Sequence, residues 1–153
     1  MIVGKLLEIN ICRAKGVPRE SIGSAIFKAD FGLVGDAYSG RGDKQVTILS
    51  QNDRIQLDKS FKNGLCVKRF KETLLIDYYD GYKEIIEDSL KKGDIHLKIG
   101  DVVIEITKVG KRCFEDCELV KEGVKCPLAT GAMFGRILEG GSLSINNSIE
   151  ILT

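Results

Sequence analysis

Neither sign of charge dominates this sequence, and no apolar run in it is long enough to cross a membrane. The chain has 23 lysines and arginines against 22 aspartates and glutamates, a formal net charge of +1, so nothing indicates a nucleic-acid partner. No apolar run approaches the roughly 20 residues that span a bilayer. The first residues, MIVGKLLEIN, lack the apolar core and cleavage site of a signal peptide. We therefore expect a cytoplasmic protein with neither a membrane nor a nucleic-acid partner.

Histidine and cysteine are too few, or too unevenly spaced, for several familiar kinds of site. The single histidine, His96, lies in an expected strand, and no Ser-His-Asp set can be assembled around it. Three of the five cysteines, Cys113, Cys117 and Cys126, are close in sequence, which is one ligand short of a structural zinc site. An iron–sulfur cluster would also need a further cysteine from elsewhere in the fold. In a reducing compartment we expect thiols, metal ligands or catalytic cysteines rather than structural disulfides.

Proline is scarce, with 2 residues, whereas glycine is abundant, with 17. The glycines separate short β-prone runs, a pattern typical of a mainly β protein. We expect strands at about 2–11, 22–28, 45–49, 65–69, 73–76, 95–98, 101–109, 133–138 and 148–152. We expect helices over 50–60 and 80–93 and a short helical turn over 116–121. This content predicts one mainly β domain over residues 1–153, a closed or partly open β-barrel with a few short helices on its rim.

Apolar side chains in these segments indicate which faces are buried. In DVVIEIT the alternation predicts that one face of the strand is core, namely Val102, Ile104 and Ile106. Ser50 can cap the first helix, in which Ile55 and Leu57 are expected to point toward the core. The apolar residues at helical spacing in the second helix are Tyr82, Ile85, Ile86 and Leu90.

Cys113 is the strongest single candidate for chemistry. It follows Lys111 and Arg112 directly after a long expected strand, and Gly110 allows a bend there. Nearby cations lower the pKa of a thiol, and the thiolate is the form that accepts sulfur, attacks or ligates a soft metal. A buried cysteine acting as a small apolar residue is the alternative. That alternative fits Cys12 and Cys66 better than Cys113, whose neighbours are charged.

A glycine-rich segment, GLVGDAYSGRGDKQVTIL from Gly32 to Leu49, is the second candidate. Its glycines leave backbone amides open to approach, and Arg41 and Lys44 add positive charge, which suits an anionic group such as a phosphate or pterin phosphate. The segment contains no GxxxxGK[ST] loop. An exposed turn with no ligand is the alternative reading of the same residues.

Four segments together resemble the molybdenum cofactor sulfurase C-terminal (MOSC) family over nearly the whole chain. They are the glycine-rich segment, RFKETLLID, LKKGDIHLKIGDVVIEITKVGKRC and MFGRILEGGSLSINNSIEI. The resemblance implies the β-barrel fold of this family, which is like that of the pyruvate kinase barrel. It also implies that Cys113 stands where the family has its reactive cysteine, which carries sulfur as a persulfide or binds molybdenum.

Other residues match the family's motifs position by position. The implied cofactor-binding set is Gly35, Asp36, Gly40, Lys44, Gln45 and Glu72, to which we add the cations Arg41, Lys111 and Arg112. The chain departs from the family where Tyr38 replaces a histidine, Thr73 an asparagine, and Lys44 the commoner arginine. A lysine keeps the charge at position 44 but lacks the bidentate fork of an arginine.

The resemblance implies a sulfur-carrier or molybdenum-cofactor-binding domain. In this interpretation Cys113 receives sulfur from a cysteine desulfurase and passes it to a metal–sulfur cofactor, or to the enzyme that holds one. Molybdopterin is the cofactor to expect, and pyridoxal phosphate is not, because that group belongs to a desulfurase domain absent from this sequence. The alternatives are a molybdenum-dependent reductase of N-hydroxylated compounds, with Cys113 as a metal ligand, and a non-enzymatic molybdopterin-binding module. A zinc or iron site at Cys113, Cys117 and Cys126 is a further, structural alternative.

Overall fold

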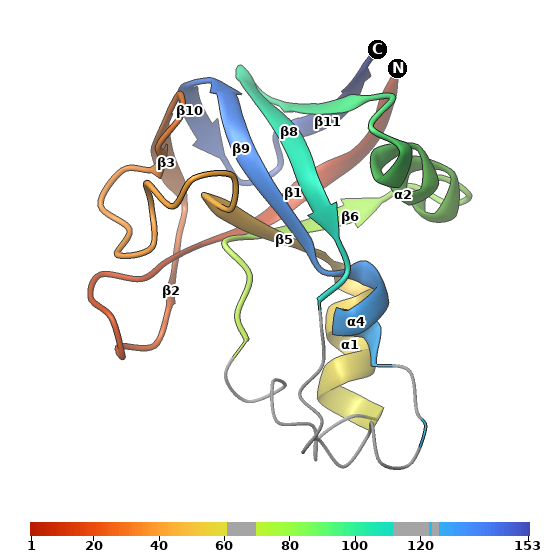
Figure 1. The fold of residues 1–153 in the computed structure, drawn as a ribbon, viewed down its shortest axis with the longest axis horizontal. Coiled ribbons are helices and arrows are strands. Elements are labelled where there is room, and N and C mark those ends of the chain that lie inside the picture. The colour runs from red at the N-terminus through yellow and green to blue at the C-terminus, as the bar shows by residue number, and fades with distance from the viewer. Residues whose placement is uncertain (61–69, 112–122, 124–125) are drawn as a thin grey trace.

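Seven strands close into a barrel in the computed structural model, which describes residues 1–60, 70–111, 123 and 126–153 (Figure 1). In order around the barrel the strands are β1 (Ile2–Ile11), β11 (Ser148–Leu152), β7 (His96–Ile99), β8 (Val102–Val109), β9 (Met133–Glu139), β5 (Val46–Ser50) and β6 (Leu74–Tyr78). β6 pairs back to β1, so the ring has no free edge. The expected mainly β barrel is confirmed, and it is closed.

Strand direction is antiparallel around this ring except at one pair. β5 and β6 run parallel, with Ile48 opposite Leu74 and Ser50 opposite Ile76. A parallel pair needs a crossover connection, and α1 (Gln51–Ser60) is part of it. The carboxyl ends of β5 and β6 therefore lie side by side, and each is followed by a helix, α1 after β5 and α2 (Lys83–Lys92) after β6.

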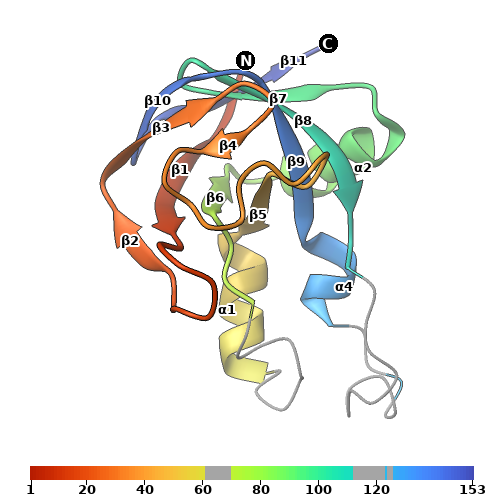
Figure 2. The ribbon, with the colours of Figure 1, turned by 60° about the vertical axis from the view of Figure 1, so that its left-hand side comes forward.

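The glycine-rich segment begins in a smaller sheet beside the barrel (Figure 2) and ends in the barrel strand β5. β2 (Glu20–Ile22) extends the ring by pairing with the end of β1. β3 (Ser24–Lys28) then pairs with both β10 (Gly141–Ser144) and β4 (Gly32–Leu33). The loop that follows β4 returns to the barrel wall at Val46, the first residue of β5.

Alternation along the strands fills the inside of the barrel with branched apolar side chains. Val102, Ile104 and Ile106 of β8 lie in the main core, as their pattern predicted. A second, smaller core lies among α1, α4 (Pro127–Gly131) and the adjoining strand residues, and its buried members are Leu49, Leu57, Cys126, Leu128 and Ala132. Figures 1 and 2 place α1 and α4 side by side at the end of the molecule opposite the two termini.

One expectation about the first helix is wrong, and the second helix buries only part of its apolar set. Leu57 is buried, but Ile55 is 44% exposed, because residues two apart lie on different faces of a helix. Ile86 and Leu90 of α2 are buried, whereas Ile85 is 65% exposed. No helix in the described part of the chain combines the length and apolar content needed to cross a bilayer.

The other element boundaries agree to within a few residues, with three additions. The expected strand over 22–28 is divided at Gly23 into β2 and β3. The two-residue β4, the four-residue β10 and the five-residue α4 were not expected. The strand expected at 65–69 and the helical turn expected over 116–121 lie outside the described residues.

Candidate functional site

Asp36, one of the expected cofactor-binding residues, holds the glycine-rich loop to the barrel. Its Oδ1 accepts hydrogen bonds from the Cys12 backbone N–H at 2.7 Å and from Arg19 Nη1 at 2.6 Å, and its Oδ2 accepts one from the Tyr38 N–H at 3.0 Å. The residue is buried, at 8% exposure. A buried carboxylate with this many donors is fully used within the protein. Asp36 therefore has a structural role: its hydrogen bonds fix the start of the loop against Cys12 and Arg19.

Gln45 plays a similar internal part at the other end of the loop. Its Oε1 accepts a hydrogen bond from the Ile137 N–H at 3.0 Å, and its Nε2 donates to Asp30 Oδ1 at 3.1 Å and to the Gly42 carbonyl at 2.7 Å. The side chain joins the loop to β9 and to the turn after β3. With only 4% of its surface exposed, it fixes the position of the residues before it.

Gly35 and Gly40 give this loop its path. Their φ angles are +91° and +81°, a left-handed region that L side chains rarely adopt. A side chain at Gly40 would also lie 3.5 Å from the ring of Phe31. Both glycines match the resemblance by position, and in this structure both set the course of the backbone.

The exposed part of the loop, Arg41 to Lys44, is where an anion can approach. A Cβ at Gly42, whose φ is +57°, would meet no atom within 4 Å. Within the described residues, the backbone N–H groups of Arg41, Gly42 and Asp43 make no hydrogen bond. Arg41 lies with its guanidinium carbon 4.7 Å from the centre of the Tyr38 ring, and Lys44 Nζ is 5.5 Å from that of Phe134. Free amides beside two cations are the chemistry that a phosphate requires.

The loop meets the strand that leads toward Cys113. Thr107 of β8 donates a hydrogen bond from Oγ1 to the Asp43 carbonyl at 2.7 Å. Lys108 of β8 is paired with Phe134 of β9, the residue beneath Lys44. The chain then continues through Gly110 to Lys111, whose N–H donates to the Leu128 carbonyl of α4 at 3.1 Å.

Lys111 is thus the last described residue before the expected reactive cysteine. Arg112, Cys113 and Cys117 lie outside the described residues. Cys126, the N-cap residue of α4, is a buried free thiol at 6% exposure, packed with the apolar side chains of the second core. Among the described residues, no group of three or more histidines, cysteines, aspartates or glutamates is arranged to hold a metal ion.

Glu72 is fully buried at 0% exposure and paired with Arg54 of α1. Arg54 Nη2 and Nε donate to Glu72 Oε2 at 2.5 and 3.2 Å, and Nη2 also donates to the Phe70 carbonyl. Glu72 Oε1 has no hydrogen-bond partner among the described residues and lies 3.4 Å from Lys71 Nζ. Burial lowers the pKa of Arg54, but hydrogen bonding and attraction by Glu72 outweigh it and raise that pKa above its ordinary value. The pair fastens α1 to the segment that enters β6.

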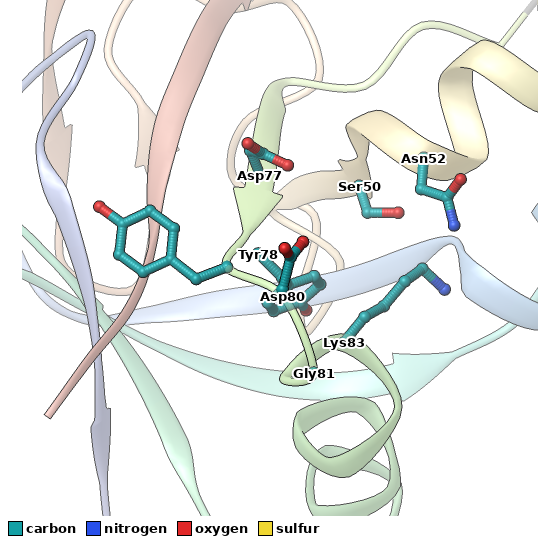
Figure 3. Close-up of a pocket in the computed structure, with 8 residues that line it drawn as sticks. Ser50, Asn52, Asp77, Tyr78, Asp80, Gly81 and Lys83 are labelled. Atoms are coloured by element: carbon teal, nitrogen blue, oxygen red, sulfur yellow. The ribbon is translucent and has the colours of Figure 1, made fainter.

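A second polar cluster was not expected from the sequence. A cavity of about 230 Å³ opens at the carboxyl ends of the parallel strands β5 and β6 (Figure 3). Ser50 and Asn52 line it from the junction of β5 and α1, Asp77 from the end of β6, and Asp80 and Lys83 from the turn into α2. Lys83 also reaches Asp53 of α1 and Glu87 of α2, both buried.

The sequence contained one signal for this cluster. Lys83 and Glu87 are four residues apart, and so are Ile86 and Leu90, the buried apolar residues of α2. A pair at this spacing reads as an exposed surface ion pair. Only the structure shows that Glu87 is buried and that Lys83 also approaches Asp53 of α1.

The fold places this chain in an architectural class, the closed seven-stranded barrels with one parallel strand pair, and its helices α1 and α4 lie at one end. No family model and no curated protein matches this chain. Solved structures do. YuaD from Bacillus subtilis aligns over 98% of this chain and 96% of its own, with a TM-score of 0.71 at 13% identity. A solved structure described only as that of a hypothetical protein aligns over 99% of this chain and 69% of its own, with a TM-score of 0.65 at 12% identity.

YiiM from Escherichia coli is also similar in structure. It covers 95% of this chain and 69% of its own, with a TM-score of 0.56 at 13% identity. YuaD and YiiM are proteins of the MOSC-domain type, so these likenesses are consistent with a MOSC-like fold. At such identities they are evidence for the fold alone.

Proposed function

We propose that this chain is a sulfur-carrier or molybdenum-cofactor-binding domain in which Cys113 carries sulfur as a persulfide. One observation supports the proposal most strongly. The exposed, cationic part of the glycine-rich loop and the strand that leads to Cys113 meet at Phe134, and the same strand is fastened to α4 through Lys111. An anion held by the loop would lie beside β8, the strand that precedes Cys113 in the sequence.

The sulfur step needs only thiol chemistry. The Cys113 thiolate attacks the outer sulfur of a donor persulfide, a new S–S bond forms, and the donor's own S–S bond breaks. The donor leaves as a thiolate, Cys113 becomes a persulfide, and no net oxidation occurs. We propose a cysteine desulfurase as the donor. The acceptor in this proposal is a molybdenum or other metal–sulfur cofactor, or the enzyme that holds it.

A second cysteine could react with the Cys113 persulfide, and Cys126 and Cys117 are the two candidates near it in the sequence. A second thiol that attacks Cys113 at its inner sulfur releases hydrogen sulfide and leaves a disulfide. Cys126, the N-cap residue of α4, is buried with the apolar side chains of the second core, so its thiol must become exposed before it can take part. Cys117 is the other cysteine near Cys113 in the sequence. We therefore favour Cys117 as the resolving thiol.

Molybdopterin fits the donor groups that the loop offers. Its phosphate would bind the free N–H groups of Arg41, Gly42 and Asp43, with Arg41 and Lys44 supplying positive charge. Asp36, Gln45 and Glu72 would act indirectly, because all three are buried and bonded within the protein. When bound, the cofactor supplies the metal–sulfur centre that receives the sulfur.

The persulfide proposal is tested by loading the protein with sulfur. Purified protein is incubated with a cysteine desulfurase and cysteine, separated from both, and assayed for cyanide-labile sulfur and by intact mass. We expect up to one sulfur per chain in the wild type, none in Cys113→Ser, and at least the wild-type amount in the matched control Cys117→Ser, which lacks the favoured resolving thiol. Undiminished sulfur in Cys113→Ser would refute Cys113 as the carrier.

The same purification separates the alternatives. Stoichiometric molybdenum that is lost in Cys113→Ala would favour a metal-ligand role in a reductase. Tight molybdopterin binding that survives Cys113→Ala, without sulfur loading, would favour a non-enzymatic binding module. Replacing Lys44 by glutamine should weaken molybdopterin binding and its salt dependence, whereas Lys92→Gln, on the exposed end of α2, should not.

A further inference from the structure

Asp53, Lys83 and Glu87 form a cluster in which two buried carboxylates share one half-buried lysine. Lys83 Nζ lies 3.2 Å from Glu87 Oε1 and 3.5 Å from Asp53 Oδ2. The side chains of Asp53 and Glu87 are only 7% and 9% exposed. With both carboxyls ionised, the cluster carries one net negative charge. An uncompensated charge that is removed from water is costly.

Each carboxylate also has an oxygen that accepts no hydrogen bond. Asp53 Oδ2 and Glu87 Oε2 are buried and receive no hydrogen bond from the described residues. Asp53 Oδ2 lies against Gly131 of α4, so closely that a Cβ at Gly131 would overlap it. Glu87 lines a cavity of about 310 Å³ between α2 and Thr130 of α4. The cluster therefore contacts three helices, α1, α2 and α4.

Few charges act on the Glu87 carboxyl. On α2 these are Lys83 and Lys91, and on α1 the charge is that of Asp53. Glu84 and Asp88, on the exposed part of α2, line the same cavity as Glu87, and α4 contributes the uncharged Thr130. The described residues of β8, which also pack against α2, add no charge that acts on Glu87. From β6 the Tyr78 hydroxyl lies near both carboxylates, with its hydrogen directed at Met133 Sδ, 4.0 Å away.

Burial is the main effect on the titration of this cluster. It raises the pKa of Glu87 above its ordinary value of 4.5, and Asp53 raises it further against the opposing effect of Lys83. Burial lowers the pKa of Lys83, but the two carboxylates outweigh it and the pKa is raised above 10.5. Lys83 therefore stays charged, and Glu87 is the group that takes up a proton.

We propose that the Asp53, Lys83 and Glu87 cluster is a proton-linked clamp that holds α2 and α4 to α1 and tightens when Glu87 is protonated. Protonation leaves Lys83 paired with Asp53 and brings the cluster to zero net charge. The neutral acid also has a hydrogen to donate, which the ionised form lacks. When α2 opens, Glu87 meets water and its pKa returns toward 4.5.

The sign of the effect follows from this difference. A carboxyl with a raised pKa in the packed state binds protons more readily when packed than when open. Packing is therefore strengthened as the pH falls through the raised pKa toward 4.5 and weakened as the pH rises through it. Because the Lys111 N–H is bonded to Leu128 of α4, the clamp also controls how firmly the end of β8 is held. This inference does not depend on the proposed sulfur chemistry.

Hydrogen exchange read by mass spectrometry tests the clamp on the full chain. Exchange of peptides that cover α2 and α4 is followed between about pH 7.5 and about pH 5 and corrected for the intrinsic rate at each pH. We expect protection of both helices to increase as the pH falls in the wild type. In Glu87→Gln, which keeps the shape but does not titrate, protection should be independent of pH. Glu84→Gln, on the exposed face of the same helix, should behave as the wild type.

Two results would overturn the clamp. One is wild-type protection that does not change with pH in either helix. The other is a pH dependence that persists unchanged in Glu87→Gln. Asp53→Asn supplies an independent readout, because removing the neighbouring negative charge should shift the transition to lower pH. Titration of the Glu87 carboxyl carbon by NMR gives the same answer for any variant that keeps Glu87 but whose helices exchange too fast to measure.

Discussion

Replacing Gln45 by methionine tests whether the loop is held by this one side chain. Methionine has a similar length and can occupy the same buried space, but it loses all three hydrogen bonds of the amide. The Ile137 N–H is left without a partner at a residue that is 1% exposed, which costs about 1–3 kcal/mol. The Gly42 carbonyl and Asp30 are exposed and can bond to water, so each loss costs about 0.5–1 kcal/mol.

These losses are partly offset by the greater apolar surface that methionine buries, about 1 kcal/mol. We expect a net destabilisation of about 1–4 kcal/mol, measured by urea unfolding followed by circular dichroism. Lys44→Met is the control: the neighbouring side chain is exposed, so its loss should change stability by no more than about 0.5 kcal/mol. Stability of Gln45→Met within about 0.5 kcal/mol of the wild type would refute the assignment of Gln45 as a structural tie.

Three further predictions concern buried polar groups. Arg54→Met removes both hydrogen bonds to the fully buried Glu72 Oε2 and leaves the half-exposed Lys71 as the only cation near this carboxyl among the described residues, so we expect a loss of about 3–5 kcal/mol in chemical unfolding, most of it restored when Glu72→Gln is added. Equal stability of the single and double variants would contradict this. Gly131→Ala forces a Cβ onto Asp53 Oδ2 and should cost about 1–3 kcal/mol; a cost that is undiminished in an Asp53→Ala background would show that the clash lies elsewhere. Burial, with Glu87 and Asp53, raises the pKa of Tyr78 well above 10.0, so absorbance titration should show one of the 4 tyrosines ionising only on alkaline unfolding.

Much of the barrel could be predicted because strand alternation is a local property. β11 has the expected bounds, 148–152, and Val102, Ile104 and Ile106 of β8 lie in the core. The short elements β4 and α4 could not be predicted in the same way. α4 has the sequence PLATG, which is too short to show a period of 3.6 residues, and its place is fixed by packing against α1.

The residues of the candidate site could be predicted from the sequence. Which of them are buried and structural, and which are exposed to a ligand, could not. Motif resemblance placed Asp36, Gln45 and Lys44 in one binding set. Only Lys44 of these is exposed. The contact that gives Gln45 its structural role is with Ile137, 92 positions away. No local pattern encodes such a pairing. The approach of Asp53 to Lys83, which lie 30 positions apart on different helices, is not encoded locally either.

The pairing of the first and last strands has a consequence for how the protein is made. Ile2 lies opposite Glu150 across the seam between β1 and β11, so the ring cannot shut until nearly all of this sequence has left the ribosome. Until then the edge of β1 that pairs with β11 has its backbone N–H and C=O groups unpaired. Contacts between such distant positions form slowly. A growing chain with an unpaired strand edge is prone to aggregate with other chains until the ring closes.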